Sequence, residues 1–177
     1  FSSSTQETSG TKDDPITGDG FMDLFTSSQD KKGKWSTPVP LNNTINTTSN
    51  EGASGFDKKC ATMYFTRCVT TPKGNFACDI YWANKSGANY GVAELLPIIE
   101  RECEGCNDSS QVGHPTLTPD DQNLVFASDM PGGYGGKDLW IISYDKKAKK
   151  WSSPKNLGKT INTPKDDMFP FIKEDGT

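Results

Sequence analysis

The 177-residue chain has few of the residues on which catalytic and nucleic-acid sites depend. It has a single histidine, His114, and neither a Gly-x-Ser-x-Gly nucleophile motif nor a phosphate-binding P-loop. No Lys/Arg cluster alternates with aromatic residues, and the net charge is −4 with a pI near 5.0. Nucleic acid and anionic membrane surfaces are therefore poor partners. No apolar run approaches the roughly 18 residues of a membrane span.

Apolar residues at helical spacing are also missing. The best candidate, the stretch from Val92 to Ile99, is interrupted by Pro97. Hydrophobic residues make up only 32%, yet there are nine Phe, five Tyr and four Trp, together with 17 Gly and 11 Pro. This composition is typical of short aromatic strands separated by turns, so it predicts an all-β fold.

One pattern occurs twice. Trp-x-x-Pro-x-x-Leu-x-x-x-Ile-Asn-Thr begins at Trp35 and again at Trp151, an offset of 116 residues that equals two periods of 58. Asp-Leu-Phe, Asp-Ile-Tyr and Asp-Leu-Trp begin at Asp23, Asp79 and Asp138, spaced 56 and 59 residues apart. Self-similarity at a fixed period indicates a repeat architecture.

Each repeat is expected to form a four-stranded antiparallel sheet. In the best-defined unit the strands are expected near residues 113–118, 123–128, 138–144 and 151–157, separated by a Thr-Pro-Asp-Asp turn, a glycine-rich loop and a lysine-rich hairpin. Such thin sheets must stack on their neighbours, and radial stacking produces a β-propeller. We therefore expect one partial propeller domain over residues 1–177, with repeat units at about 1–64, 65–125 and 126–177. It would be an interior piece of a longer protein, and three blades would be half of a six-bladed ring.

In detail, this fold predicts eleven strands in three stacked sheets, with large apolar residues between the blades. The expected inter-blade core consists of Phe65, Phe126, Trp140, Leu157 and Phe171.

Several of these stretches also carry a family resemblance. They are Trp151-Ser-Ser-Pro154, Ile161-Asn-Thr163, Asp167-x-Phe-Pro170, Thr118-Pro-Asp-Asp121 and the glycine loop that leads to Asp138-Leu-Trp140. The chain resembles the TolB-type, WD-like propeller repeat of Bacteroidetes envelope proteins, strongly over 110–177 and more weakly over 1–100. In proteins of this kind, such as the PorE component of the type IX secretion system, the propeller lies between a tetratricopeptide region and an OmpA-like domain.

The resemblance implies a non-catalytic protein-interaction scaffold in the periplasm, associated with the outer membrane and belonging to a type IX secretion or gliding complex. Its partners would be envelope proteins, with peptidoglycan bound only through another domain. Two alternatives remain: a propeller that gates a hydrolase or peptidase domain outside this chain, and a glycan-binding module that uses aromatics such as Tyr90 and Tyr134. Segments 2–20 and 101–111 depart most from the repeat pattern and are the expected partner contacts.

The five cysteines favour an oxidising compartment. Cys68 and Cys78 flank a Gly-Asn turn region, so neighbouring antiparallel strands are expected to bring them within disulfide distance. Cys103 and Cys106 form a Cys-x-x-Cys pair, for which a structural loop disulfide, free thiols and a metal or redox site all remain open, with the disulfide favoured. Cys60 is expected to be unpaired.

The recurring polar and aromatic residues are expected to be structural. Trp35 and Trp151 would each pack an outer strand onto its own blade. Asp23, Asp79 and Asp138 would accept backbone N–H bonds from the loop before them.

The chain offers one candidate general base. His114 could act at the axial mouth of the propeller, but its place in the repeat matches Phe169 of the next unit, which indicates a first-strand residue. No catalytic, cofactor-binding or metal-binding residue is therefore predicted, and no cofactor.

Overall fold

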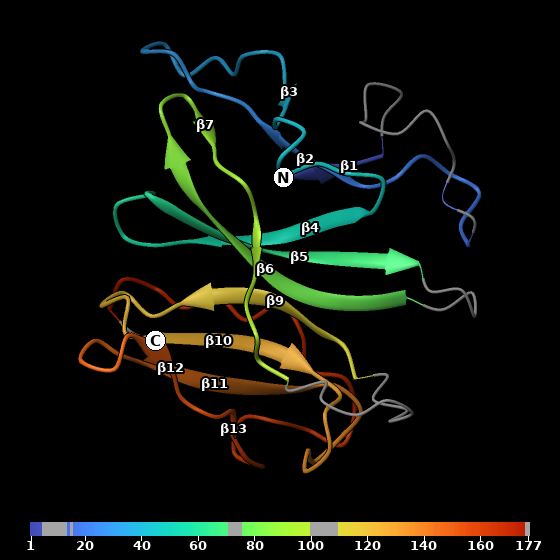
Figure 1. Ribbon diagram of the computed structural model, residues 1–177, viewed down its shortest axis with the longest axis vertical. Helices are drawn as coiled ribbons and strands as arrows, with labels where there is room; N and C mark the ends of the chain where they lie inside the picture. The colour runs from blue at the N-terminus through green and yellow to red at the C-terminus, as the bar shows by residue number, and fades with distance from the viewer. Residues whose placement is uncertain (5–13, 15, 71–75, 100–109, 176–177) are drawn as a thin grey trace.

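The computed structural model describes residues 1–4, 14, 16–70, 76–99 and 110–175 (Figure 1). These residues form thirteen strands in three antiparallel sheets, which confirms the all-β prediction. The strands are β1 (Ser2–Ser3), β2 (Asp23–Thr26), β3 (Val39–Pro40), β4 (Asn50–Phe56), β5 (Thr62–Thr70), β6 (Phe76–Ser86), β7 (Asn89–Tyr90), β8 (Glu94–Leu95), β9 (Val112–Leu117), β10 (Asn123–Ser128), β11 (Asp138–Asp145), β12 (Lys150–Trp151) and β13 (Lys155–Asn156).

The three sheets share one topology. The first has the order β1-β2-β3, the second β4-β5-β6-β7 and the third β9-β10-β11-β12, while β8 and β13 also pair with β6 and β11. The number of strands exceeds the expected eleven because the outer strand is divided into two short segments in each of two sheets, β7 and β8 in the second and β12 and β13 in the third. The expected unit boundaries after residues 64 and 125 fall inside β5 and β10, because a sequence period fixes the length of a repeat but not its starting point.

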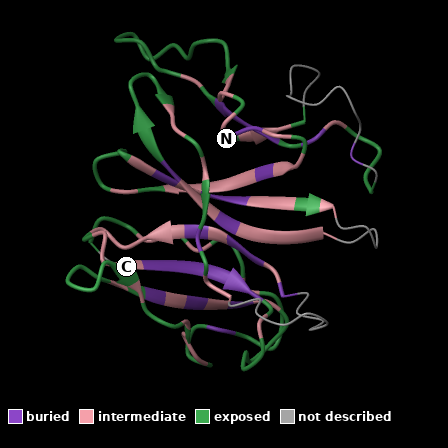
Figure 2. Cartoon of the chain, viewed as in Figure 1, coloured by how far each residue is buried: buried purple, intermediate pink, exposed green. Residues whose placement is uncertain are grey.

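Side-chain alternation explains how the central strands are buried. In β11, Asp138, Trp140 and Ile142 are buried while the residues between them are more exposed, which is the period of two expected of a strand. In β10 all residues from Leu124 to Ser128 are buried, so both faces of that strand are covered. Figure 2 shows β10 as the most continuously buried strand of the third sheet.

Two hydrophobic clusters join the sheets in sequence. Leu24 and Ile45 of the first sheet region pack with Met63 and Phe65 of the second. The second cluster joins the second and third sheets and consists of Ile80, Leu96, Val112, Leu124, Phe126, Trp140 and Ile142. The second sheet therefore buries one face against the first sheet and the other against the third, as propeller blades do.

The first strands of neighbouring sheets approach most closely. A Cβ placed on Gly55 in β4 would lie 2.6 Å from the carbonyl oxygen of Pro115 in β9, so only glycine permits this approach. Ala53 in β4 and His114 in β9 have φ values of 38° and 55°, and register irregularities occur at both places. These bulges bend equivalent points of the two inner strands.

The expected core is partly wrong. Phe65, Phe126 and Trp140 are buried, but Leu157 is only half-buried and Phe171 is 81% exposed. Phe171 lies after the last strand of the third sheet, and no described sheet packs against its side chain. Burial of an inter-blade residue requires the neighbouring blade as well as the residue's own.

A candidate binding cleft between the second and third sheets

Asp138 holds the glycine-rich loop that precedes β11. Its carboxylate accepts hydrogen bonds from the backbone N–H of Tyr134 and of Gly135 (3.0 Å) and from Nδ2 of Asn156 (2.8 Å). Burial acts to raise the pKa of Asp138, but these hydrogen bonds outweigh it and lower the pKa overall. Asp23 is fully buried at the matching position of the first sheet and Asp79 is half-buried in the second. These contacts make Asp138 part of the scaffold.

Two asparagines missed by sequence reasoning extend the sheets. Oδ1 of Asn162 accepts from the N–H of Leu139 (2.8 Å), and its Nδ2 donates to the Leu139 carbonyl (3.1 Å). Asn46 makes the same pair with Leu24, at 2.9 and 3.0 Å. Both asparagines are buried and belong to the repeated Ile-Asn-Thr motif. The repetition of that motif was the available signal, since a side-chain amide can imitate a neighbouring peptide group.

The threonine of the same motif binds an acidic residue four positions later. Thr47 donates to Glu51 through its N–H (3.1 Å) and its Oγ1 (2.6 Å), and Thr163 bonds Asp167 in the same way. Glu51 is fully buried and also pairs with Nε of Arg67 at 2.8 Å. Burial raises the pKa of Glu51 despite these hydrogen bonds and the Arg67 charge. This polar network closes the turn that enters β4.

The structure confirms one predicted disulfide. Cys68 in β5 and Cys78 in β6 are directly paired in register and joined by a disulfide bond. Cys60 is exposed and free. Cys103 and Cys106, like most of segments 2–20 and 101–111 that were expected to contact partners, lie outside the described residues.

The two repeated tryptophans have different surroundings, contrary to the expectation of one shared role. The ring of Trp151 packs against Tyr144 of its own sheet (centroids 5.2 Å apart) and, edge-on, against Tyr64 of the second sheet (6.3 Å). Trp35 is 63% exposed. Trp151 thus spans two sheets, whereas Trp35 lines an open cleft between the first and second sheets.

Trp151 lies in a cleft of about 570 Å³ between the second and third sheets. Its floor contains Tyr64, Trp82, Leu96 and Leu117, and Tyr144 stands beside Trp151 on the wall. The rim carries both signs of charge: Asp57, Asp120, Asp121, Lys59, Lys146 and Lys149. Burial raises the pKa of the Tyr64 hydroxyl to about 12, and Asp57 and Asp121 add to the shift. Tyr64 is therefore a neutral hydrogen-bonding group at physiological pH.

The rim is fixed by contacts between the hairpins. Oδ1 of Asp121 in the third sheet accepts from the backbone N–H of Lys58 in the second, at 2.9 Å. Asp120 is held by Oγ1 of Thr118 (2.5 Å) and the N–H of Gln122 (3.0 Å), which lower its pKa. An aromatic floor with fixed charges of both signs suits a ligand that is partly apolar and partly charged, such as a peptide.

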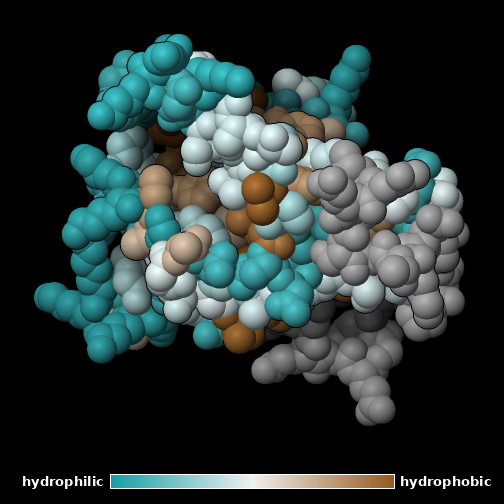
Figure 3. All heavy atoms as spheres, turned by 90° about the horizontal axis from the view of Figure 1, so that it is seen from above, coloured by the Kyte–Doolittle hydropathy of each residue, from teal (hydrophilic) through white to brown (hydrophobic). Residues whose placement is uncertain are grey.

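A larger cleft of about 620 Å³ lies between the first and second sheets. Its lining includes Phe1, Trp35, Phe56, Met63 and Tyr90 and has no charged side chain. Figure 3 shows hydrophobic surface recessed behind hydrophilic residues at this end of the molecule. The cleft at Trp151 is the better candidate because it combines aromatic and charged groups.

His114 lies outside both clefts, on the inner strand β9. Its ring stacks on Phe169 with centroids 3.8 Å apart, and its backbone N–H donates to Oγ1 of Thr66 (2.8 Å). Burial lowers the pKa of His114, and the Lys137 charge adds to the shift. His114 and Phe169 have positive φ values of 55° and 56°, which is compatible with the equivalent positions that the repeat predicts for them.

Within the described parts of the chain, no group of three or more His, Cys, Asp or Glu side chains is placed to hold a metal ion. The same residues include no helix with the length and apolar character needed to cross a membrane.

No protein-family model matches the chain, and no curated protein does. Among solved structures it is similar to a putative TolB from Agrobacterium tumefaciens, with 20% identity and a TM-score of 0.48, over 86% of this chain and 47% of that one. It is also similar to TolB from Acinetobacter baumannii, with 15% identity and a TM-score of 0.44, over 78% of this chain and 27% of that one. The chain thus spans less than half the length of either structure, and these similarities are too low to assign it to a family.

Proposed function

We propose that this chain is a non-catalytic interaction scaffold of the bacterial cell envelope, whose stacked sheets present edges and hairpins to protein partners. One observation carries the proposal: the polar residues that recur from sheet to sheet are engaged in holding the backbone. Asp138, Asn46 and Asn162 bind main-chain groups of their own sheets, while the aromatic cleft surrounds the repeated Trp151 with residues that do not recur, such as Tyr64 and Tyr144. A constant framework with individual loops suits docking.

The periplasm is the proposed location. The Cys68–Cys78 disulfide favours an oxidising compartment, and the bacterial periplasm is one. From the sequence resemblance we further propose attachment to the outer membrane through a flanking OmpA-like domain, and a role in type IX secretion or gliding.

Site-specific photo-crosslinking in cells tests the scaffold role. A crosslinker at Gln122, on the cleft rim, is compared with one at Lys159, which is exposed on the turn after β13. We expect the crosslinker at Gln122 to form discrete adducts with envelope proteins. The crosslinker at Lys159 should form none of these adducts. The full-length protein should also be required for secretion or gliding in its source organism. Hydrolase activity that purifies with the full-length protein and is lost on His114→Ala would contradict the proposal.

The glycan-binding alternative gains little from the exposed aromatics. Tyr134 is 52% exposed on the glycine loop before β11, whereas Tyr90 is half-buried in β7 of another sheet. Sugar binding by stacking needs rings on one surface, and these two belong to different sheets.

A further inference from the structure

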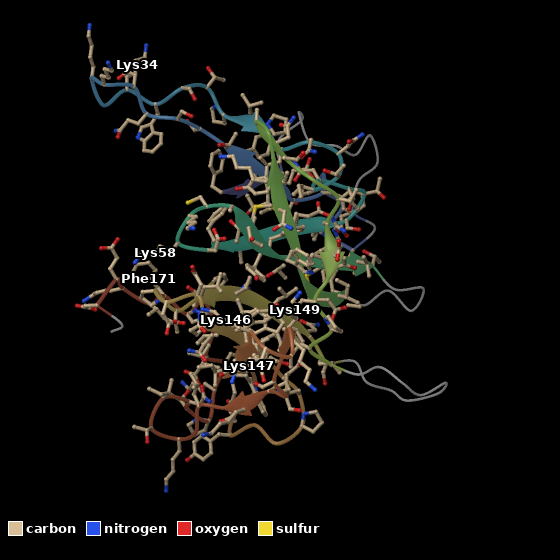
Figure 4. All side chains as sticks on the ribbon, turned by 60° about the vertical axis from the view of Figure 1, so that its left-hand side comes forward. Lys34, Lys58, Lys146, Lys147, Lys149 and Phe171 are labelled. Atoms are coloured by element: carbon tan, nitrogen blue, oxygen red, sulfur yellow. A yellow bond between two sulfur atoms is a disulfide. The ribbon has the colours of Figure 1, made fainter. Side chains whose placement is uncertain are left out.

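One end of the sheets carries most of the positive charge of an acidic protein. The turns that join β2 to β3, β4 to β5, β6 to β7, β9 to β10 and β11 to β12 all lie at the same end of the antiparallel sheets (Figure 1). Ten exposed lysines occupy these turns and the strand ends beside them: Lys31, Lys32, Lys34, Lys58, Lys59, Lys85, Lys146, Lys147, Lys149 and Lys150. We call this surface the hairpin face. It follows the left-hand side of Figure 1, and Figure 4 shows Lys34, Lys58, Lys146, Lys147 and Lys149 across it.

The acidic residues of the hairpin face are fewer and are tied to the turns. Glu174 of the C-terminal segment lies beside Lys58 and Asp121. The turns themselves hold five: Asp30, Asp57, Asp120, Asp121 and Asp145. Each accepts at least one backbone N–H bond, as Asp30 does from Lys32 and Lys34 (2.8 and 2.9 Å) and Asp145 from Lys147 and Ala148 (2.8 and 3.0 Å). Among the described residues, the ammonium groups of the ten lysines form no ion pair within 4.0 Å. The face is therefore positive in a chain of net charge −4.

The cleft at Trp151 opens onto this face. Lys59, Lys146 and Lys149 belong both to its rim and to the hairpin face. Positive charge around an aromatic hollow attracts an acidic ligand from a distance and gives it a place to bury an apolar group.

We propose that the hairpin face binds an acidic segment of a partner protein, with one aromatic or aliphatic side chain of that segment inserted beside Trp151. The proposal rests on the scaffold function and names the chemistry of its partner. The mixed rim favours a peptide over a uniformly anionic polymer, because Asp57, Asp120 and Asp121 would repel a polymer charged at every unit. A peptide can present its acidic residues to the lysines and neutral or donor groups to these carboxylates.

Selection from a displayed library of random short peptides on the full chain tests the proposal. We expect the enriched peptides to carry Asp or Glu on both sides of a large apolar residue. Lys146→Glu combined with Lys149→Glu should weaken the selected peptides at least about fivefold, because two exposed attractive charges become repulsive. The matched control is Lys159→Glu combined with Lys165→Glu, which changes the net charge equally away from the hairpin face. Affinity should also fall as salt rises.

Several results would overturn the inference. They are selected peptides without acidic bias, equal affinities for the two double variants, or stronger binding of a uronic-acid polymer than of any peptide, which would assign the face to anionic glycans. If Gln122 still crosslinks to the same envelope proteins in the Lys146→Glu/Lys149→Glu variant, the scaffold role stands and only the acidic-peptide inference fails.

Discussion

The side-chain amide of Asn46 pairs with the peptide group of Leu24 through two hydrogen bonds, of 2.9 and 3.0 Å, as a neighbouring strand would. Its Nδ2 also donates to the carbonyl of Leu41 at 3.2 Å. One side chain thus joins β2 to the segment that follows the outer strand β3.

Asn46→Asp should therefore destabilise the protein strongly. The substitution removes the amide donor, leaves the Leu24 and Leu41 carbonyls without it, and buries a carboxylate beside them. We expect a loss of about 2–4 kcal/mol in the free energy of unfolding. Asn43→Asp introduces the same charge at an exposed position and is the control. Equal urea midpoints for the two variants would disprove the pairing.

The buried pair of Glu51 and Arg67 allows a second prediction. Arg67→Met removes the partner of a buried carboxylate and should cost about 3–5 kcal/mol. Adding Glu51→Gln should recover part of that loss, because the uncompensated charge is then absent. Chemical unfolding of the two single variants and the double variant measures the coupling, and additive losses would show that the pair does not interact.

The same pair predicts a dependence on pH. Burial raises the pKa of Glu51 in the folded state above its usual 4.5. The folded state therefore binds the proton more tightly, and the contribution of Glu51 to stability is fully present below pH 4.5 and declines as the pH rises through its folded pKa. The unfolding free energy of the wild type minus that of Glu51→Gln should therefore fall as the pH rises from 4.5 through the folded pKa of Glu51. A difference that grows with pH would mean that Arg67 dominates the environment of Glu51.

Removing the Cys68–Cys78 disulfide should lower stability by about 2–3 kcal/mol, since the bond closes a short loop in the unfolded chain. We expect this loss for the variant with both residues changed to alanine, and for the wild type under reducing conditions. Cys60→Ala should change nothing, because Cys60 is exposed and free. Thermal unfolding with and without reductant measures all three, and an unchanged midpoint on reduction would contradict the prediction.

Two phenylalanines that the sequence assigned to the inter-blade core should respond differently to truncation. Phe126→Ala should cost about 3–5 kcal/mol, because the ring is fully buried between the second and third sheets. Phe171→Ala should cost less than about 0.5 kcal/mol, because that ring is 81% exposed. Similar losses for both, measured by denaturant unfolding, would mean that Phe171 is packed in solution.

The sequence predicted local geometry well because that geometry repeats. The period identified the stacked antiparallel sheets, and an acidic residue after a glycine loop indicated the hydrogen bonds that Asp138 accepts. The role of Asn162 was missed because asparagine in a polar stretch also suits a turn, and its partner Leu139 is brought near only by the folded sheet. Trp35 and Trp151 share every spacing yet differ in exposure, since exposure depends on the neighbouring sheet.

The cleft could not be predicted from spacing. Tyr64 and Trp151 belong to different repeats and meet only because the second and third sheets stack. The sequence predicted a lysine-rich hairpin exposed to solvent. That the lysines of several hairpins lie at the same end of the molecule depends on the antiparallel order of all three sheets.

The stacking of the sheets has a consequence for cooperativity. Among the described strands, those of the first sheet contact the second, those of the second contact the third, and none of the first touches the third. The free energy of the stack is then close to a sum of terms for single sheets and for adjacent pairs, as in a one-dimensional array. The first sheet can detach at the cost of one interface while the interface around Phe126 persists. Amide protons of β2 should therefore exchange through a sub-global opening, and those of β5, whose sheet takes part in both interfaces, only through unfolding of the whole stack.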